Sequence, residues 1–207
     1  MQPPLPNLSA VTTSLAIPLN CSPEQTQRLA QLQQVFAQAC NVVAEVAQAN
    51  RCWNRVALHH LAYRRVREQF ADLGSQMACN AVYSVCKACR WLYQHPASPF
   101  TRRAAQGGPL PRVVFLPIAP VYFDRHTLNI TAGQLSMFTL DGRLKFQIDL
   151  SEAQELRFRS AKLKETALTR GPRGYQLVFW FESEAPEAPV GPYQSMPEFL
   201  KPEPIEA

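Results

Sequence analysis

The segment LHHLAYRRVREQF, residues 58–70, decides the fold class of this chain. Its apolar residues recur at the three- and four-residue spacing of an amphipathic helix. Arginine side chains occupy the rest of the helical surface, at Arg64, Arg65 and Arg67. The spacing therefore predicts a helix that packs on one side and is cationic on the other.

A second helix is predicted directly after the first, from the segment LGSQMACNA at residues 73–81. Gly74 separates the two helices, and Ser75 is expected to be the N-cap, because a serine side chain can accept a hydrogen bond from a free N–H of the first turn. Apolar residues then continue at helical spacing as far as Leu92. Basic and aromatic residues lie toward the far end of this helix, at Lys87, Arg90 and Trp91.

A third helix is predicted upstream, where Ser22, Pro23 and Gln25 form a capping box with proline at the first helical position. Its apolar stripe continues to about Asn50. With the two helices above it makes a three-helix unit over residues 22–95, which the proline-rich and glycine-rich segments that follow bring to an end.

Beyond Pro111 the period of the sequence changes from helical to strand-like. Six strands are predicted, at residues 112–116, 121–123, 135–139, 145–150, 162–168 and 175–181, with turns at 141–143 and 171–174. Another strand, at residues 13–19, precedes the helices, and Pro18 favours an edge position for it. Adding this strand to the later sheet predicts an α+β fold. In that fold the helical unit is inserted into a small antiparallel barrel or sandwich made of residues 11–20 and 110–182.

The last segment, residues 183–207, is rich in proline and carries one lysine against five glutamates, a net charge of −4. This composition predicts an extended and poorly ordered acidic tail.

The whole chain has a net charge of +5, which hides a strong asymmetry. Between Arg51 and Arg112 ten basic residues face two acidic ones, a net charge of +8. A cationic surface binds polyphosphate by releasing counterions, so nucleic acid is the expected partner. An ordinary solvated charged surface is the alternative.

The 207 residues are 46% hydrophobic, enough for a substantial core. The sequence contains no run of 18 apolar residues and begins without a signal-peptide pattern, so a soluble cytoplasmic protein with no membrane partner is expected. Reduced thiols are expected for the six cysteines.

Motifs for catalysis or cofactor binding are not found in the sequence, and no cofactor is expected. Cys86 and Cys89 form a single C-x-x-C that lacks a second pair at zinc-ribbon spacing, so core packing is the favoured interpretation. His59 and His60 have no neighbouring acid or thiol in the sequence and are interpreted as helix residues.

The segment 58–81 resembles the recognition region of the TnpB (OrfB) transposon-encoded proteins and the related type V CRISPR effectors, which are RNA-guided DNA nucleases. Residues 13–19 resemble the first strand of this family, and residues 22–25 resemble its opening helix cap. Residues 135–143 and 165–168 resemble strands of its oligonucleotide-binding-like wedge barrel. The resemblance implies a helical recognition domain inserted into a wedge barrel, with a RuvC-like nuclease domain after it.

The resemblance also implies a DNA-reading site at the N-terminal ends of two helices. By position, the residues that match are Trp53, Asn54, Ser75, Gln76, Cys79 and Asn80. Asparagine and glutamine can contact adenine bidentately in the major groove. Helix capping is an equally good interpretation for Asn54 and Ser75, and the two roles are compatible.

Phosphate contacts are expected from two groups of basic residues. The helical group is Arg64, Arg65, Arg67, Lys87 and Arg90, and the barrel group is Arg143, Lys145, Arg157, Arg159, Lys162 and Lys164. Trp91 or Tyr93 could stack on an unpaired base, with burial in the core as the alternative.

The expected function is therefore that of a nuclease-deficient, TnpB-like protein that binds guide RNA and double-stranded target DNA beside a short motif. Where the RuvC-like domain would begin, only 25 residues remain, so we expect no catalytic residues, no metal site and no enzyme activity in this chain. Occupancy of the DNA, or a separate nuclease or other effector protein, would then produce the effect. A protein-interaction adaptor, a guide-free DNA-binding regulator and a decayed transposon fragment are the alternatives.

Overall fold

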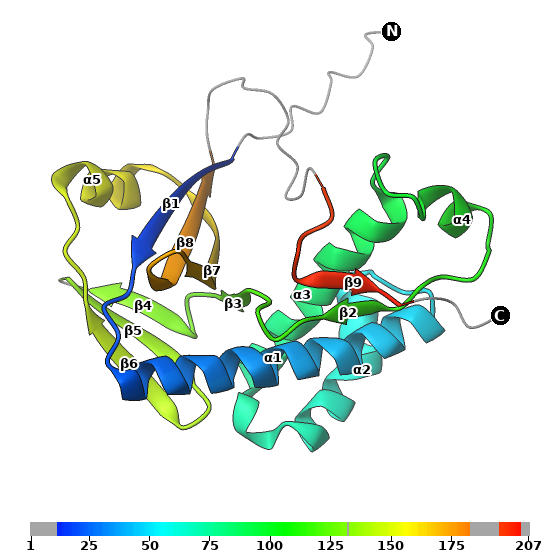
Figure 1. Ribbon diagram of the computed structural model, residues 1–207, viewed down its shortest axis with the longest axis horizontal. Coiled ribbons are helices and arrows are strands. Elements are labelled where there is room, and N and C mark those ends of the chain that lie inside the picture. Colours follow the sequence, from blue (N-terminus) through cyan, green and yellow to red (C-terminus); the bar gives the residue numbers. More distant parts are fainter. Residues whose placement is uncertain (1–11, 132, 183–194, 204–207) are drawn as a thin grey trace, which may run out of the picture.

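The structure of the protein is a computed structural model that describes residues 12–131, 133–182 and 195–203. It is a mixed α+β fold in which a group of helices lies beside a group of antiparallel strands (Figure 1). The helices are α1 (Pro23–Ala49), α2 (Arg55–Gln69), the 3-10 turn η1 (Ala71–Leu73), α3 (Ser75–Gln94), α4 (Thr101–Ala105) and α5 (Glu152–Ser160). The strands are β1 (Thr12–Pro18), β2 (Val113–Phe115), β3 (Val121–Phe123), β4 (Leu128–Thr131), β5 (Gln134–Thr139), β6 (Gly142–Gln147), β7 (Leu163–Gly171), β8 (Gly174–Glu182) and β9 (Leu200–Pro202).

Helix α1 begins as the sequence predicts. The Ser22 side chain accepts a hydrogen bond from the backbone N–H of Gln25, and the Gln25 side chain accepts one from the backbone N–H of Ser22. With Pro23 at the start, this capping box satisfies two of the free N–H groups of the first turn. The helix is 27 residues long and extends along both the strands and the other helices (Figure 1).

Helices α2 and α3 start differently from one another. The Asn54 side chain is the expected N-cap of α2 and accepts hydrogen bonds from Val56 N and Ala57 N. The predicted capping role of Ser75 is wrong, because Ser75 is the first residue inside α3 and Gly74 occupies the cap position. Gly74 has a φ of 75°, which an L-residue adopts only at a cost, so the glycine sets the turn between the helices.

The described strands form three separate antiparallel sheets, so the small barrel that was expected as one of two forms is not closed. Sheet A has the order β1-β8-β7-β3, sheet B pairs β2 with β9, and sheet C has the order β4-β5-β6. A closed barrel gives every strand two hydrogen-bonded neighbours, whereas β3 pairs only with β7 and β4 pairs only with β5. Strands β3 and β4 follow one another in the sequence but are edge strands of different sheets, and α5 lies in the sequence between β6 and β7.

Strand β1 joins the later sheet, as predicted, and takes an edge position next to β8. The helices α1, α2 and α3 therefore lie in the sequence between β1 and the strand that it pairs with. The buried side chain of Gln33 on α1 adds a second connection to this sheet, because the Tyr175 hydroxyl of β8 donates to its Oε1 at 3.3 Å.

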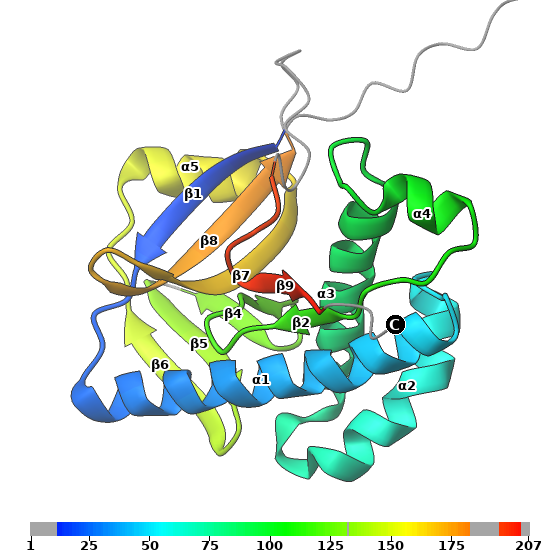
Figure 2. The same ribbon diagram turned by 45° about the vertical axis from the view of Figure 1, so that its right-hand side comes forward.

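Part of the predicted acidic tail is ordered, which corrects the prediction for residues 195–203. Leu200 is buried in the common core, and β9 pairs in antiparallel register with β2 (Figure 2). Arg112 also pairs with Glu203 at 2.7 Å. Composition alone missed this strand because it is only three residues long and ends in Pro202, yet the side chain of Leu200 is buried. Residues 183–194 and 204–207 lie outside the described residues.

Replacing Leu200 by alanine tests whether this strand belongs to the folded unit. The L200A variant should lose about 2 kcal/mol of unfolding free energy, because a buried leucine is removed and a cavity is left. Urea denaturation followed by circular dichroism measures the loss. The control K201A changes the neighbouring exposed side chain of the same strand and should leave the midpoint unchanged; equal midpoints for both variants and the parent would contradict the packing of β9.

Candidate nucleic-acid interface

Several of the predicted phosphate-binding arginines have acidic partners within the protein. Arg65 pairs with Glu45 of α1 at 2.8 Å, and Arg112 pairs with the other oxygen of the same carboxylate at 2.7 Å. Arg64 pairs with Glu68, which lies one turn along α2, and the Arg64 side chain is 91% exposed. Exposed pairs of this kind are weak, so a phosphate could compete for Arg64, but the shared Glu45 site is part of the fold.

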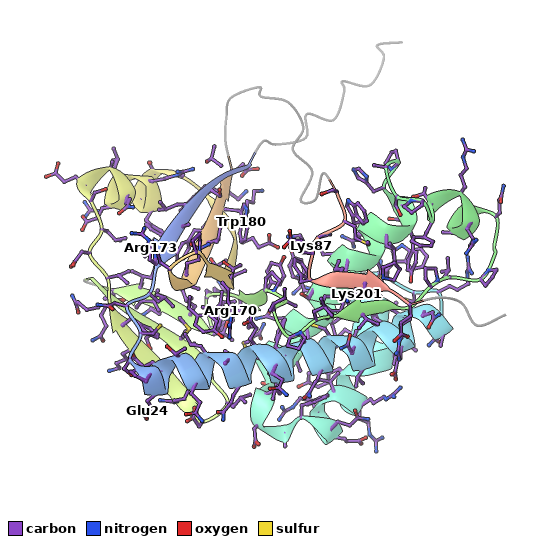
Figure 3. All side chains as sticks on the ribbon, in the orientation of Figure 1. Glu24, Lys87, Arg170, Arg173, Trp180 and Lys201 are labelled. Atoms are coloured by element: carbon purple, nitrogen blue, oxygen red, sulfur yellow. The ribbon has the colours of Figure 1, made fainter. Side chains whose placement is uncertain are left out.

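Lys87 is the most buried of the basic side chains that form ion pairs in the described residues. Its ammonium donates to Glu165 of β7 at 2.6 Å, and both side chains are 14% exposed. Tyr83 donates to the other oxygen of the Glu165 carboxylate at 2.6 Å. Burial lowers the pKa of Lys87 below its usual value, and the charge of Glu165 opposes that shift. Figure 3 shows the Lys87 side chain on α3 beside Trp180 of β8, so this ion pair joins the helices to sheet A and is structural.

The amide side chains predicted to read DNA on α3 are also used within the fold. Gln76 donates to the Asp124 carboxylate, and Asn80 is 5% exposed and donates to the backbone oxygen of Tyr122 at 3.0 Å. Cys79 contacts Nε2 of His59 at 3.6 Å. Ser75 is exposed at the start of α3. Asn80 is therefore a structural residue in this conformation, and we leave it out of the interface.

The aromatic residues at the end of α3 follow the alternative interpretation. Trp91 is 6% exposed and stacks on His95, and Tyr93 is 2% exposed and donates its hydroxyl to the backbone oxygen of Pro111. Both rings belong to the core. Trp53, which is half-buried, contacts the Tyr93 ring with 5.0 Å between centroids and is held in place by it.

A shallow depression of about 380 Å³ lies where α1 ends, α2 begins and α3 approaches its C-terminus. Its lining residues are Arg51, Cys52, Trp53, Asn54, Arg90 and Gln94. Trp53, Asn54 and Arg90 were predicted site residues, and the structure brings these three together. We call this feature the arginine depression.

The local geometry orients two of its polar groups. Arg51 has a positive φ of 46° in the sharp link between α1 and α2, and its guanidinium donates to the backbone oxygens of Gly108 and Ala104 at 2.8 and 3.0 Å. Asn54 uses its side-chain oxygen to cap α2, whereas no described residue accepts a hydrogen bond from its Nδ2. The capping role thus leaves a donor facing the solvent.

The charge around the depression is uniformly positive. Arg55 lies 5.2 Å from the centre of the Tyr83 ring, and within the described part of the chain no carboxylate lies within 4 Å of the guanidinium nitrogens of Arg51, Arg55 or Arg90. Burial raises the pKa of the Cys86 thiol to about 11, although the positive charges of Arg90 and Arg55 act to lower it. These two arginines therefore lie near one buried point from two different helices.

The two predicted DNA-reading helix ends do not lie together. Arg55 at the start of α2 lies against Tyr83, eight residues beyond Ser75 along α3. At 1.5 Å per residue this places the start of α3 about 12 Å farther along the helix pair. The arginine depression therefore contains Trp53 and Asn54 but neither Ser75 nor Gln76.

The predicted basic residues of the strand region form separate surfaces. Arg143 and Lys145 are exposed on β6, Arg157 and Arg159 lie on α5, and Lys162 and Lys164 precede or begin β7. Lys162 and Lys164 both pair with Glu182, at 3.2 and 2.8 Å, and Arg159 pairs with Glu155 at 3.2 Å. Arg157 lies 5.0 Å from the centre of the Phe181 ring. Among the described residues, Arg143, Lys145 and Arg157 have no carboxylate within 4 Å.

Sequence reasoning missed the contributions of Arg51 and Gln94 to the depression, and the position of Arg55 beside it. A usable signal was present, because residues 51–67 contain no acidic residue. The sequence does not predict how close the start of α2 lies to the last turns of α3. These two segments are connected through the opposite ends of both helices, at residues 70–74.

No family model matches this chain, and no curated protein matches it. The resemblance to the TnpB group therefore stays a prediction based on the residues quoted above. Among residues 12–131, 133–182 and 195–203, no group of three or more His, Cys, Asp and Glu side chains could hold a metal ion. Each helix within those ranges is either too short or too polar to cross a membrane.

Two substitutions on α3 test whether Lys87 stabilises the fold while Arg90, three residues further along, does not. K87Q should lower the unfolding free energy by about 3 kcal/mol, because Glu165 is left charged and buried without its partner. R90Q should change it by less than about 0.5 kcal/mol, because Arg90 is exposed and makes no ion pair with any residue that the structure describes. Guanidinium denaturation of both variants measures the difference, and equal unfolding free energies would contradict this assignment.

Proposed function

We propose that this chain is a nucleic-acid-binding protein that takes up phosphate at the arginine depression. The observation that carries the proposal is that Arg51 and Arg90 line the depression together with Trp53, and that Arg55 follows Asn54 at the start of α2. No described carboxylate lies within ion-pair distance of any of these three arginines. Guanidinium groups bind phosphate oxygens bidentately and release counterions from the polymer, which gives affinity without base specificity.

The same depression offers two groups that could contact bases. The free Nδ2 of Asn54 is a hydrogen-bond donor that suits the acceptors N7 and O6 of guanine or O4 of thymine in a major groove. Its position at the N-terminus of α2 also adds the positive end of a helix dipole to the site. Trp53 also lines the depression and is held in place by its contact with the Tyr93 ring.

The resemblance to the TnpB group refines the proposal to an RNA-guided DNA-binding protein. In this refinement the guide RNA supplies sequence specificity by base pairing, and the protein reads a short adjacent motif in duplex DNA. This chain would bind without cutting, and occupancy or a separate effector protein would produce the outcome. Sequencing of RNA that copurifies with the chain tests the refinement, because a guide gives one population of defined length.

The alternatives give different results in the same preparation. A guide-free DNA-binding regulator keeps sequence-specific duplex binding after ribonuclease treatment, whereas a guided protein loses it. A protein-interaction adaptor has no affinity for RNA or DNA at moderate salt. Magnesium-dependent strand scission by the purified chain would contradict the part of the proposal that excludes cleavage.

Replacing one arginine of the depression, Arg90, and one beside it, Arg55, tests the binding site itself. R55Q and R90Q should each weaken binding of a 20-base-pair duplex or a 20-nucleotide RNA by roughly tenfold at 150 mM salt. Each should also reduce the slope of log affinity against log salt by about 1, because one phosphate contact is lost. Fluorescence anisotropy with labelled oligonucleotides between 50 and 250 mM salt measures both quantities.

The matched control is R173Q, which removes the same charge from the exposed turn between β7 and β8 on the sheet side of the molecule (Figure 3). Its affinity and salt slope should equal those of the parent. If all three variants reduce the slope alike, the protein binds by net charge alone and the arginine depression is not the site.

A further inference from the structure

Sheet C has one apolar face and one polar face. The register of β4, β5 and β6 places Leu128, Met137 and Leu144 in one row on the buried side. The intervening positions point to the other side and are exposed or half-buried; they are Asn129, Thr131, Gln134, Ser136, Phe138, Arg143, Lys145 and Gln147. The alternation follows from the two-residue period of a strand. We call this second side the outer face of sheet C.

An exposed aromatic ring lies on this outer face with a cation against it. Phe138 is 40% exposed, an unusual position for a phenylalanine, and its cross-strand neighbour is Arg143. The guanidinium of Arg143 lies 4.1 Å from the centre of the Phe138 ring. It also donates to the backbone oxygens of Ser136 and His126 at 3.2 and 3.0 Å, so the guanidinium is held in place.

The charge of the outer face is positive without compensation. Arg143 and Lys145 project from β6, and none of the outward positions of the three strands carries a carboxylate. The nearest acidic residue in the hairpin is Asp141 at the β5–β6 turn, which pairs with Arg28 of α1 at 2.6 Å. The other outward side chains are amides and hydroxyls, which can donate to and accept from base edges.

We infer that the outer face of sheet C is a binding platform for single-stranded nucleic acid, with an unpaired base stacking beside Phe138 and Arg143 and the phosphates lying along Lys145. This inference goes beyond the proposed function, because it assigns a second site and its ligand. Charge complementarity identifies a polyanion, and the exposed ring identifies unpaired bases. Bases in a duplex already stack on their neighbours and present no free face to a side chain.

The platform lies far from the arginine depression. Gln25 and Arg28 near the start of α1 bond to the backbone of Lys145 and to Asp141, whereas Arg51 and Cys52 follow the end of α1. The two sites are therefore separated by about the length of a 27-residue helix, which is about 40 Å. An octanucleotide covers about 27 Å at the stacked spacing of 3.4 Å per nucleotide, so it reaches only one of them.

The test uses the full chain and labelled octamers of uridine and of thymidine, with an eight-base-pair duplex alongside. F138A should weaken octamer binding about tenfold, in the range of one lost stacking contact, and leave the salt slope unchanged. K145Q should lower that slope by roughly 0.7, the value for one phosphate contact of a single strand. F138W should restore the affinity, and its fluorescence should be quenched when the octamer binds.

The control L156A removes another exposed apolar side chain, from α5, and should bind like the parent. Comparable losses for F138A and L156A, or equal losses of octamer and duplex binding in F138A, would overturn the inference. The uridine and thymidine arms show whether the platform takes RNA, DNA or both. The variant R90Q distinguishes the two sites. If octamer binding depends on Phe138 but not on Arg90, the platform is supported even if the proposed function fails. If octamer binding depends on Arg90 alone, the platform is rejected.

Discussion

The pairing of β1 with β8 is the constraint on which the remaining architecture depends. Pro18 lies opposite Gln176, 158 positions along the chain, and seven residue pairs form the ladder. Forming this ladder closes a loop that contains the helices α1 to α5 and the strands β2 to β7, at an entropic cost that grows only slowly with loop length. The segment between β1 and β8 begins and ends at the same sheet, and α1 follows β1 directly in the sequence. The length of α1 therefore sets the distance between the strands near its start and the helices near its end.

The basic residues divide into two groups according to whether a carboxylate meets them inside the fold. Lys87 with Glu165, and Arg65 and Arg112 with Glu45, join segments that are distant in sequence, so their charges hold the molecule together. Arg55, Arg90 and Lys145 meet no such partner among the described residues. A net charge of +8 between residues 51 and 112 therefore overstates the cationic surface, because part of it is neutralised internally.

The free cations gather at opposite ends of α1 in two different chemical settings. At one end Arg51 and Arg90 line a depression with a half-buried tryptophan and an asparagine donor, which suits the backbone and groove edge of a nucleic acid. At the other end an arginine lies against an exposed phenylalanine on a flat polar sheet, which suits an unpaired base. A polymer in contact with both surfaces must span about 40 Å, about a dozen stacked nucleotides.

Local patterns in the sequence were enough to predict the three long helices, the capping box at Ser22, the cap at Asn54, the edge strand β1 and the hairpin of β7 and β8. Each of these depends on residues within a few positions of one another, where propensity and period act directly. The openness of the sheets, the burial of Leu200 and the assignment of each arginine depended on contacts between distant segments. Lys87 and Arg90 lie one helical turn apart and have the same charge, yet only Lys87 faces Glu165 of β7, because the way α3 packs against sheet A decides which side of the helix is enclosed.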